Sequence, residues 1–175
     1  MSAPFTVRPF ERHEWPLLRE LRLRALADAP DAFARTVEEE QDRPDAEWAR
    51  QLALSTASDD QLSLVAERAG RGVGLAYTRL DPVARDTAHL FSMWVAPEAR
   101  RLGVGRALVA AVASWAQAHG ARRLELRVTR GNRAAEQLYE RGGLRFTGEV
   151  ERLRAGSPLE VRTMDLDLGG GPVSV

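Results

Sequence analysis

Apolar residues along the chain follow two spacings, one typical of helices and the other of strands. A helical spacing, with apolar residues at i, i+3, i+4 and i+7, occurs within residues 15–27 and again within 107–119. Weaker helical patterns cover residues 32–40 and 45–54. A short helix is predicted over residues 132–141, with Asn132 as its N-cap.

Strand-like segments separate these helices. Short alternating or continuous apolar runs predict strands at residues 6–10, 61–68, 73–80, 90–95, 123–129, 144–150 and 159–168. The predicted fold is therefore mixed α/β, with a mainly antiparallel sheet flanked by helices. We expect a single domain over residues 1–168 and a disordered tail over residues 169–175, which begins with three glycines.

Composition narrows the possible function classes. The 25 basic and 25 acidic residues cancel, so no net charge favours nucleic acid or an acidic membrane. The absence of cysteine excludes disulfides, thiolate metal sites and thiol catalysis within this chain. No apolar run approaches the length of a membrane span, and no segment resembles a signal peptide. We expect a cytoplasmic protein without a metal, present as a monomer or homodimer.

A glycine-containing turn between a strand and a helix is the most informative segment. It reads Arg100-Arg101-Leu102-Gly103-Val104-Gly105-Arg106. The first turn of a helix has N–H groups without helical acceptors, and its dipole favours negative charge. Glycine allows close approach of a ligand to the backbone, and arginine adds charge-assisted hydrogen bonds to phosphate. We interpret the segment as a pyrophosphate site, the alternative being an ordinary solvated turn.

A second candidate motif begins the predicted helix at residues 132–141. Asn132 and Tyr139 are seven residues apart, about two helical turns, so their side chains share one face. Each also has a purely structural interpretation. Asparagine is a common helix cap, and a tyrosine near a helix end often completes a core.

The order of these motifs resembles that of the GNAT superfamily of N-acyltransferases. Its Arg/Gln-x-x-Gly-x-Gly/Ala signature is met by Arg100, Gly103 and Gly105, and its asparagine and leucine-tyrosine pair fall on Asn132, Leu138 and Tyr139. Residues 21–26 and 28–33 look like a bacterial subgroup whose substrates are mostly unassigned.

The resemblance implies a specific cofactor site for acetyl-CoA, which would lie between two separated central strands. Main-chain groups of Met93, Trp94 and Val95 would pair with its pantetheine arm. N–H groups from Arg101 to Arg106 would hold the pyrophosphate, with charge from Arg100. Asn132 would bond the pantetheine arm, and Tyr139 would lie near the thioester sulfur.

The implied reaction is direct attack of a primary amine, of a small molecule or a protein, on the thioester in a ternary complex. A lysine-like amine with a pKa of about 10.4 needs about 4 kcal/mol to lose its proton near neutral pH, which favours a general base. Tyr139 is the predicted acid for the leaving thiolate, and a main-chain N–H at Val95 or its neighbour would polarise the carbonyl. His89 and Asp86 are candidate bases, with a water chain as the alternative. The glutamate that some relatives use on the next strand corresponds here to Arg127, so that device is expected to be absent.

Three other functions are conceivable for these motifs. A Rossmann-type dinucleotide site is disfavoured because Leu108 stands where the third glycine is required and Glu125 lies inside a strand pattern. A P-loop is disfavoured because no Gly-Lys-Ser/Thr follows the glycines. A non-catalytic acyl-CoA-binding sensor on the same fold is the main alternative. The acceptor amine is left open between a protein N-terminus, a lysine, a polyamine, an amino acid and an aminoglycoside.

Overall fold

A seven-stranded sheet runs through the protein and joins its two halves. The computed structural model describes residues 4–169. The strands are β1 (Phe5–Pro9), β2 (Gln61–Arg68), β3 (Arg71–Leu80), β4 (Thr87–Val95), β5 (Arg123–Thr129), β6 (Arg145–Arg152) and β7 (Glu160–Asp167). The helices are α1 (Trp15–Asp28), α2 (Val37–Gln41), α3 (Asp45–Ala57), α4 (Val104–Ala118) and α5 (Arg133–Arg141), with short 3-10 turns η1 (Arg12–Glu14), η2 (Pro30–Ala32) and η3 (Pro97–Ala99).

The strand order is β1-β2-β3-β4-β5-β7-β6. Every neighbouring pair is antiparallel except β4 and β5, which are parallel. Parallel neighbours need a long crossover, and α4 provides it. The predicted mixed α/β fold, with a mainly antiparallel sheet and flanking helices, is confirmed.

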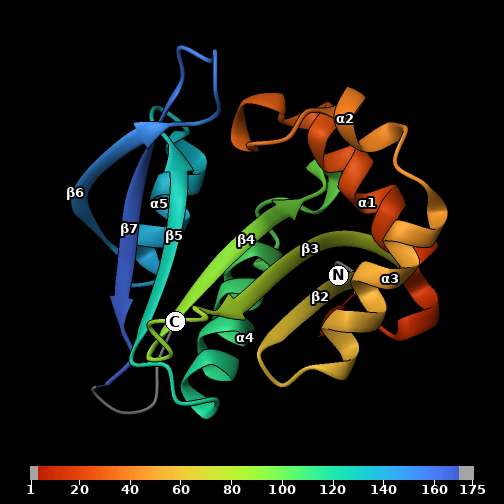
Figure 1. The fold of residues 1–175 in the computed structure, drawn as a ribbon, viewed down its shortest axis with the longest axis horizontal. Coiled ribbons are helices and arrows are strands. Elements are labelled where there is room, and N and C mark those ends of the chain that lie inside the picture. The colour runs from red at the N-terminus through yellow and green to blue at the C-terminus, as the bar shows by residue number, and fades with distance from the viewer. Residues whose placement is uncertain (1–3, 170–175) are drawn as a thin grey trace.

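The central parallel pair separates part of the way along its length. Register pairs between β4 and β5 end at Leu90 and Leu126, although β4 continues to Val95 (Figure 1). Just beyond Leu90 the pairing of β4 with β3 is irregular, since Ala76 opposes two residues, and one of them, Ser92, has a φ of 51°. A bulge of this kind bends a strand and increases its local twist. The bulge therefore turns the end of β4 away from β5.

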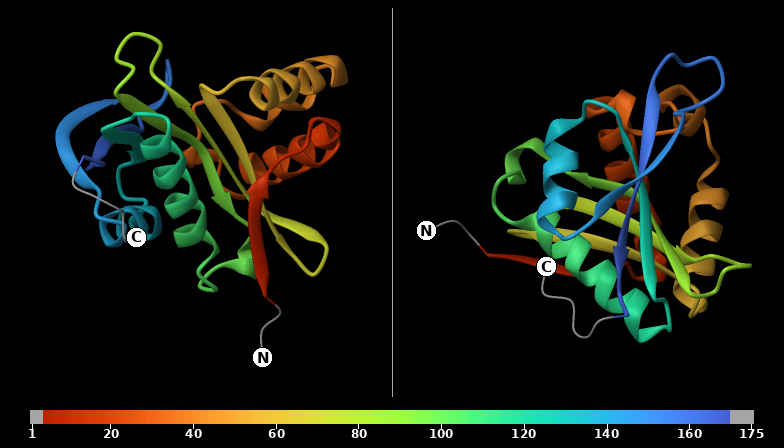
Figure 2. Two further views of the ribbon diagram at one scale, coloured as in Figure 1. Left: turned by 90° about the horizontal axis from the view of Figure 1, so that it is seen from below. Right: turned by 90° about the vertical axis from the view of Figure 1, so that its left-hand side faces the viewer.

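Helices cover both faces of the sheet (Figure 2). α1 and α3 pack on one face, against β3 and β2, while α4 packs on the other face against β3 and β4. Of the predicted apolar face of α4, Leu108 and Val112 are inaccessible to solvent, while Ala111 and Trp115 are only partly buried against the core. Within residues 4–169, no helix is long and apolar enough to cross a bilayer.

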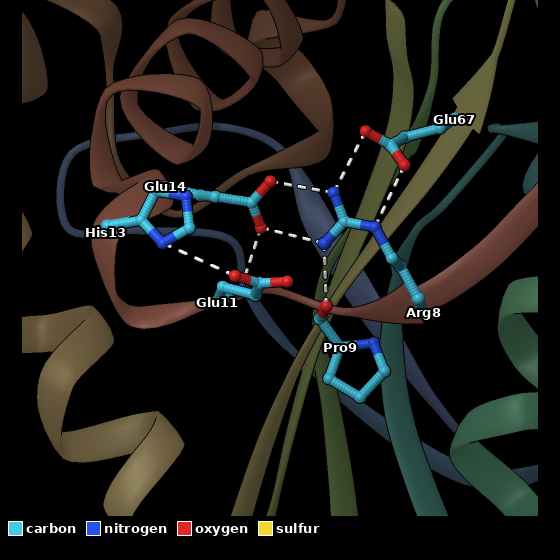
Figure 3. Close-up of polar contacts among 6 residues, drawn as sticks. All are labelled: Arg8, Pro9, Glu11, His13, Glu14 and Glu67. Carbon is cyan, nitrogen blue, oxygen red and sulfur yellow. Dashed lines mark hydrogen bonds and ion pairs between the residues drawn. The ribbon is translucent and has the colours of Figure 1, made fainter. Parts of the chain in front are cut away.

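An arginine at the edge of the sheet ties the first strand to its surroundings (Figure 3). Both carboxylate oxygens of Glu14 accept hydrogen bonds from Arg8, at 2.7 and 2.8 Å, and both oxygens of Glu67 do so at 2.9 and 3.0 Å. Glu14 also accepts a bond from the main-chain N–H of Glu11 at 2.8 Å. The hydrogen bonds from Arg8 lower the pKa of Glu14 to about 2. Bidentate pairs of this kind hold β1, β2 and the start of α1 in one arrangement.

The predicted helix over residues 32–40 is wrong in its first half. Phe33 is extended, with φ −128° and ψ 144°, and α2 begins only at Val37. Thr36 sets this start, because its side chain accepts a bond from the Glu39 N–H while the Glu39 carboxylate accepts one from the Thr36 N–H. The other predicted elements are confirmed, with boundaries within a few residues. The predicted disordered tail falls almost wholly outside the described residues.

We predict that Glu14→Gln lowers the free energy of unfolding at pH 7 by about 2 kcal/mol, since charge-assisted hydrogen bonds to Arg8 are lost. Because the folded protein lowers this pKa below its ordinary 4.5, the stabilisation is complete above pH 4.5 and disappears as the pH falls toward 2. Urea unfolding at pH 7, 4.5 and 3 should show the difference from wild type shrinking with acid. The exposed Glu140→Gln is the control, and a difference independent of pH would contradict the assignment.

Candidate functional site

A cavity of about 1200 Å3 lies between the helices α1–α3 and the central strands. Its sheet side includes residues of β3, β4 and β5 on both sides of the point where β4 and β5 separate. Residues at the start of α5 and near the end of that helix line it as well. One cavity thus joins the helical layer to the separated strands.

The end of α1 and the turn that follows it are bonded to both separating strands. Asp28 accepts a hydrogen bond from the indole N–H of Trp94, on β4, at 2.8 Å. The main-chain carbonyl of Asp31 accepts one from the hydroxyl of Thr129, at the end of β5, at 2.6 Å. Two residues of one short segment therefore fix the distance between strands that no longer pair with each other.

The predicted anion-binding turn forms the corner between β4 and α4. Gly103 is the N-cap of α4 with a φ of 87°, a conformation that favours glycine, and Arg101 also has a positive φ, of 62°. The first main-chain bond of the helix runs from the Ala107 N–H to the Gly103 carbonyl at 3.0 Å. The N–H groups of residues 104–106 therefore precede the helical ladder and are suited to hold an anion.

Gly105 has a packing role that the sequence did not reveal. A Cβ at this position would lie 3.1 Å from Leu138 Cδ2 and 3.6 Å from Met93 Cε. The missing side chain lets the start of α4 lie against α5 and β4 beside the strand separation. Any larger residue would have to displace Leu138.

The three arginines of the turn differ in their surroundings. The guanidinium of Arg100 is bonded to the carboxylate of Asp28, and its Nε donates to the Val95 carbonyl at 3.0 Å. Arg101 and Arg106 are exposed at the start of α4. Arg100 thus tethers the turn to α1, whereas the other two guanidinium groups lie at the surface beside the helix N-terminus. Between them Leu102 is partly exposed and the side chain of Val104 is buried, so both could contribute only main-chain groups.

The three β4 residues predicted to bind a pantetheine arm lie after the separation from β5. Trp94 and Val95 pair with Leu75 and Gly74 of β3, and Met93 lines the cavity. Their pairing with β3 leaves the opposite edge of β4 without a strand, and the cavity lining follows β4 as far as Met93 but does not include Trp94 or Val95. This is the arrangement in which an extended chain can add to a strand edge.

Asn132 and Tyr139 both line this same cavity. Asn132 caps α5 as predicted, its side-chain oxygen accepting from the Ala135 N–H at 3.3 Å. The side chain of Tyr139 is only 6% exposed, and burial raises the pKa of its hydroxyl. Tyr139 therefore keeps its proton throughout the physiological range and can act as a donor.

His89 lies between two carboxylates on the sheet side of the cavity. Its Nε2 is 3.0 Å from Asp81 Oδ2, and its Nδ1 is 3.5 Å from Glu125 Oε1. Main-chain N–H groups of Ala84 and Val83, at 2.8 and 2.9 Å, and His89 lower the pKa of Asp81 to about 2. An ionised carboxylate only accepts hydrogen bonds, so Nε2 carries a proton and Nδ1 is the nitrogen that can take one up.

Only one of the two candidate bases lines the cavity, and a glutamate lies beside it. Asp86 is exposed at the start of β4, accepts a bond from the Thr87 hydroxyl at 3.3 Å, and is absent from the cavity lining, whereas His89 is part of it. Arg127 holds the position at which some relatives were expected to have a glutamate, but another glutamate of the same strand, Glu125, lies 3.5 Å from His89. The parallel register pairs His89 with Glu125, which lies two residues before Arg127. The alternation within residues 123–129 already predicted that Glu125 and Arg127 share one face of the strand. Register across a crossover is the information that the sequence lacked.

Comparison with known proteins places this geometry in a family. The model of the acetyltransferase (GNAT) family matches residues 17–144. A mycothiol acetyltransferase of Thermobispora bispora is 32% identical over 135 residues, which is 74% of this chain and 43% of that protein. The chain spans less than half the length of the curated relatives it matches.

Solved structures show the same fold. A GNAT-family acetyltransferase of Streptococcus pneumoniae has a TM-score of 0.80 at 24% identity, covering 94% of this chain and 99% of that one. The protein yncA of Salmonella typhimurium, solved with its cofactor acetyl-CoA, has a TM-score of 0.79 at 18% identity and covers 99% of both chains.

Proposed function

The chain belongs to the acetyltransferase (GNAT) family, and on that basis we propose that it transfers the acetyl group of acetyl-CoA to a primary amine of a small molecule or a protein. The observation that carries the proposal is the meeting of three features in one cavity: the unpaired edge of β4, the buried hydroxyl of Tyr139, and His89 between carboxylates. The fold it shares with a protein solved with acetyl-CoA supports this proposal.

The residues of the turn before α4 and of the separated end of β4 fit an acyl-CoA. Main-chain N–H groups of residues 101–106 and the guanidinium groups of Arg101 and Arg106 would hold the pyrophosphate, with Arg100 fixing the turn through Asp28. Main-chain groups of Met93, Trp94 and Val95 and the side chain of Asn132 would hold the pantetheine arm. When bound, acetyl-CoA supplies a thioester whose carbonyl carbon the amine attacks, so that a C–N bond forms as the C–S bond breaks.

The proton of the amine goes to His89 in this proposal. Nδ1 accepts it, and Asp81 stabilises the resulting imidazolium through Nε2. The carboxylate of Glu125, on the Nδ1 side, attracts the ammonium form of the incoming amine. A main-chain N–H of β4, at Val95 or its neighbour, polarises the carbonyl oxygen.

Tyr139 supplies the second proton. Its raised pKa keeps the hydroxyl protonated, and it donates to the sulfur as the thiolate leaves. The non-catalytic alternative, a module that binds acyl-CoA without turnover, has no use for a buried phenol and a histidine between carboxylates in the same cavity. The alternative is therefore disfavoured.

Several properties stay predictions. The acceptor is proposed only as an amine, since the relatives named mycothiol acetyltransferases match this chain over less than half of their own length. A cytoplasmic location, the absence of a metal and of nucleic acid, and a monomeric or homodimeric state are also predictions.

The proposal is tested by release of free thiol from acetyl-CoA with pooled amines. We expect amine-dependent release by the wild type, and a kcat lowered about 100-fold or more by Tyr139→Phe, because the leaving sulfur loses its proton donor. Tyr77→Phe, which removes the other tyrosine of the sequence, is the matched control for loss of a hydroxyl. Tight CoA binding without thiol release would favour the sensor, and full activity of Tyr139→Phe would refute the assigned acid.

We predict that His89→Gln lowers kcat/KM for an amine at pH 7 by about 100-fold, since general-base catalysis is lost. The deficit should shrink as the pH rises toward the pKa of the amine, where the neutral nucleophile forms without help. Asp86→Asn, at the candidate base outside the cavity, should leave kcat/KM within about twofold of wild type at each pH. A pH-independent deficit, or an equal loss in Asp86→Asn, would exclude His89 as the base.

A further inference from the structure

Arg22 lines the cavity and has a buried donor without an acceptor. This arginine of α1 lines the cavity on its helical side, and its guanidinium lies over the ring of Phe33, with Cζ 4.7 Å from the ring centre. Among residues 4–169, its Nη1 atom is one of four buried side-chain polar atoms that have no hydrogen-bond partner. A buried unpaired donor is costly, and native proteins usually supply it with a protein, water or ligand acceptor.

The carboxylate that interacts electrostatically with Arg22, that of Glu40, is already paired with two other arginines. Glu40 is 4% exposed, and its two oxygens face Arg35 Nε at 3.4 Å and Arg43 Nη1 at 3.2 Å. Burial lowers the pKa of Arg22, the charges of Arg35 and Arg43 lower it further, and Glu40 raises it. Three guanidinium groups therefore surround one buried carboxylate, although Arg43 also contacts Glu47 at 3.3 Å. The positive charge is local to these guanidinium groups, since Glu39, Asp42 and Glu47 also line this side of the cavity.

A second buried donor lines the same helical side. The indole N–H of Trp48, a residue 1% exposed, is also without a partner in the described chain, and Arg43 lies over its ring at 4.3 Å. Buried tryptophan N–H groups usually have an acceptor. Both donors belong to residues that line one cavity, and neither can accept a hydrogen bond.

The sheet side of the same cavity has a local acidic cluster. Asp81 and Glu125 flank His89 there and suit an ammonium group, although Arg79, Arg127 and Arg152 also line this side. A ligand that contacts both the His89 cluster and Arg22 would carry an amine at one end and an acceptor of hydrogen bonds at the other.

We infer that Arg22 binds a carboxylate of the acceptor, so that the substrate class is a primary amine bearing a carboxylate, such as an amino acid. The inference rests on the proposed acetyl transfer and names its acceptor. The planar guanidinium offers several N–H groups and binds carboxylates with defined geometry, which fixes the amine relative to the thioester. Arg22 is a specificity residue in this scheme and takes no part in proton transfer.

The test compares L-amino acids with their carboxamides as acceptors, by thiol release. The wild type should prefer the acids even though an adjacent carboxylate raises the pKa of the amine and by itself slows attack. Arg22→Met should lower kcat/KM for the acids about 10- to 100-fold, the loss expected for a charge-assisted hydrogen bond, and leave the carboxamides unchanged. Arg22→Lys keeps the charge without the planar group and should fall between the two. The exposed Arg50→Met on α3 is the control for removing an arginine.

A binding measurement separates this inference from the proposed transfer. In the presence of CoA, N-acetyl-amino acids should raise the melting temperature of the wild type, while their carboxamides and the Arg22→Met variant show no such shift. Unchanged melting temperature and CoA affinity of Arg22→Met without these ligands would establish that the variant folds. Equal turnover of acids and carboxamides would overturn the inference and leave acetyl transfer intact. Absence of turnover with selective binding of N-acetyl-amino acids would uphold the Arg22 site and count against the proposed transfer. Absence of both would overturn the inference.

Discussion

The structure depends on the end of main-chain pairing between two neighbouring strands. β4 and β5 pair as far as Leu90 and Leu126, and beyond these residues β4 presents one edge to a cavity instead of to a strand. Main-chain N–H and C=O groups need partners, so such an edge favours an extended ligand. The amide-containing arm of the proposed acyl-CoA would meet this need. In that proposal, binding is a consequence of an interrupted sheet more than of any one side chain.

Two devices keep the strands apart. The bulge at Ser92 turns β4, and the end of α1 with the turn after it holds both strands through Asp28 and Asp31. Asp28 also holds Arg100, so the same carboxylate joins α1, β4 and the turn that begins α4. The turn at the start of α4, our proposed pyrophosphate site, and the strand separation are thereby mechanically linked.

Local signals were sufficient for most of the fold. Turn residues, apolar spacing and the Asn132 cap predicted the elements and the strand-turn-helix corner, because these features depend on residues close in sequence. The failures concern long-range geometry. The side chain of Arg100 turns to a carboxylate 72 residues earlier, Glu125 meets His89 only through a parallel register, and the three arginines around Glu40 come together through packing of α1 and α2. No local pattern encodes such pairings.

Hydrogen–deuterium exchange with and without acetyl-CoA tests the central claim most directly. The account predicts slower exchange at residues 91–95 of β4 and at 101–106, where the ligand would pair with the strand edge and the helix N-terminus. Exchange on β6, which lies at the far edge of the sheet, should not change. If acetyl-CoA leaves both segments unchanged, or protects residues elsewhere instead, the separated strands are not the cofactor site and the account is wrong.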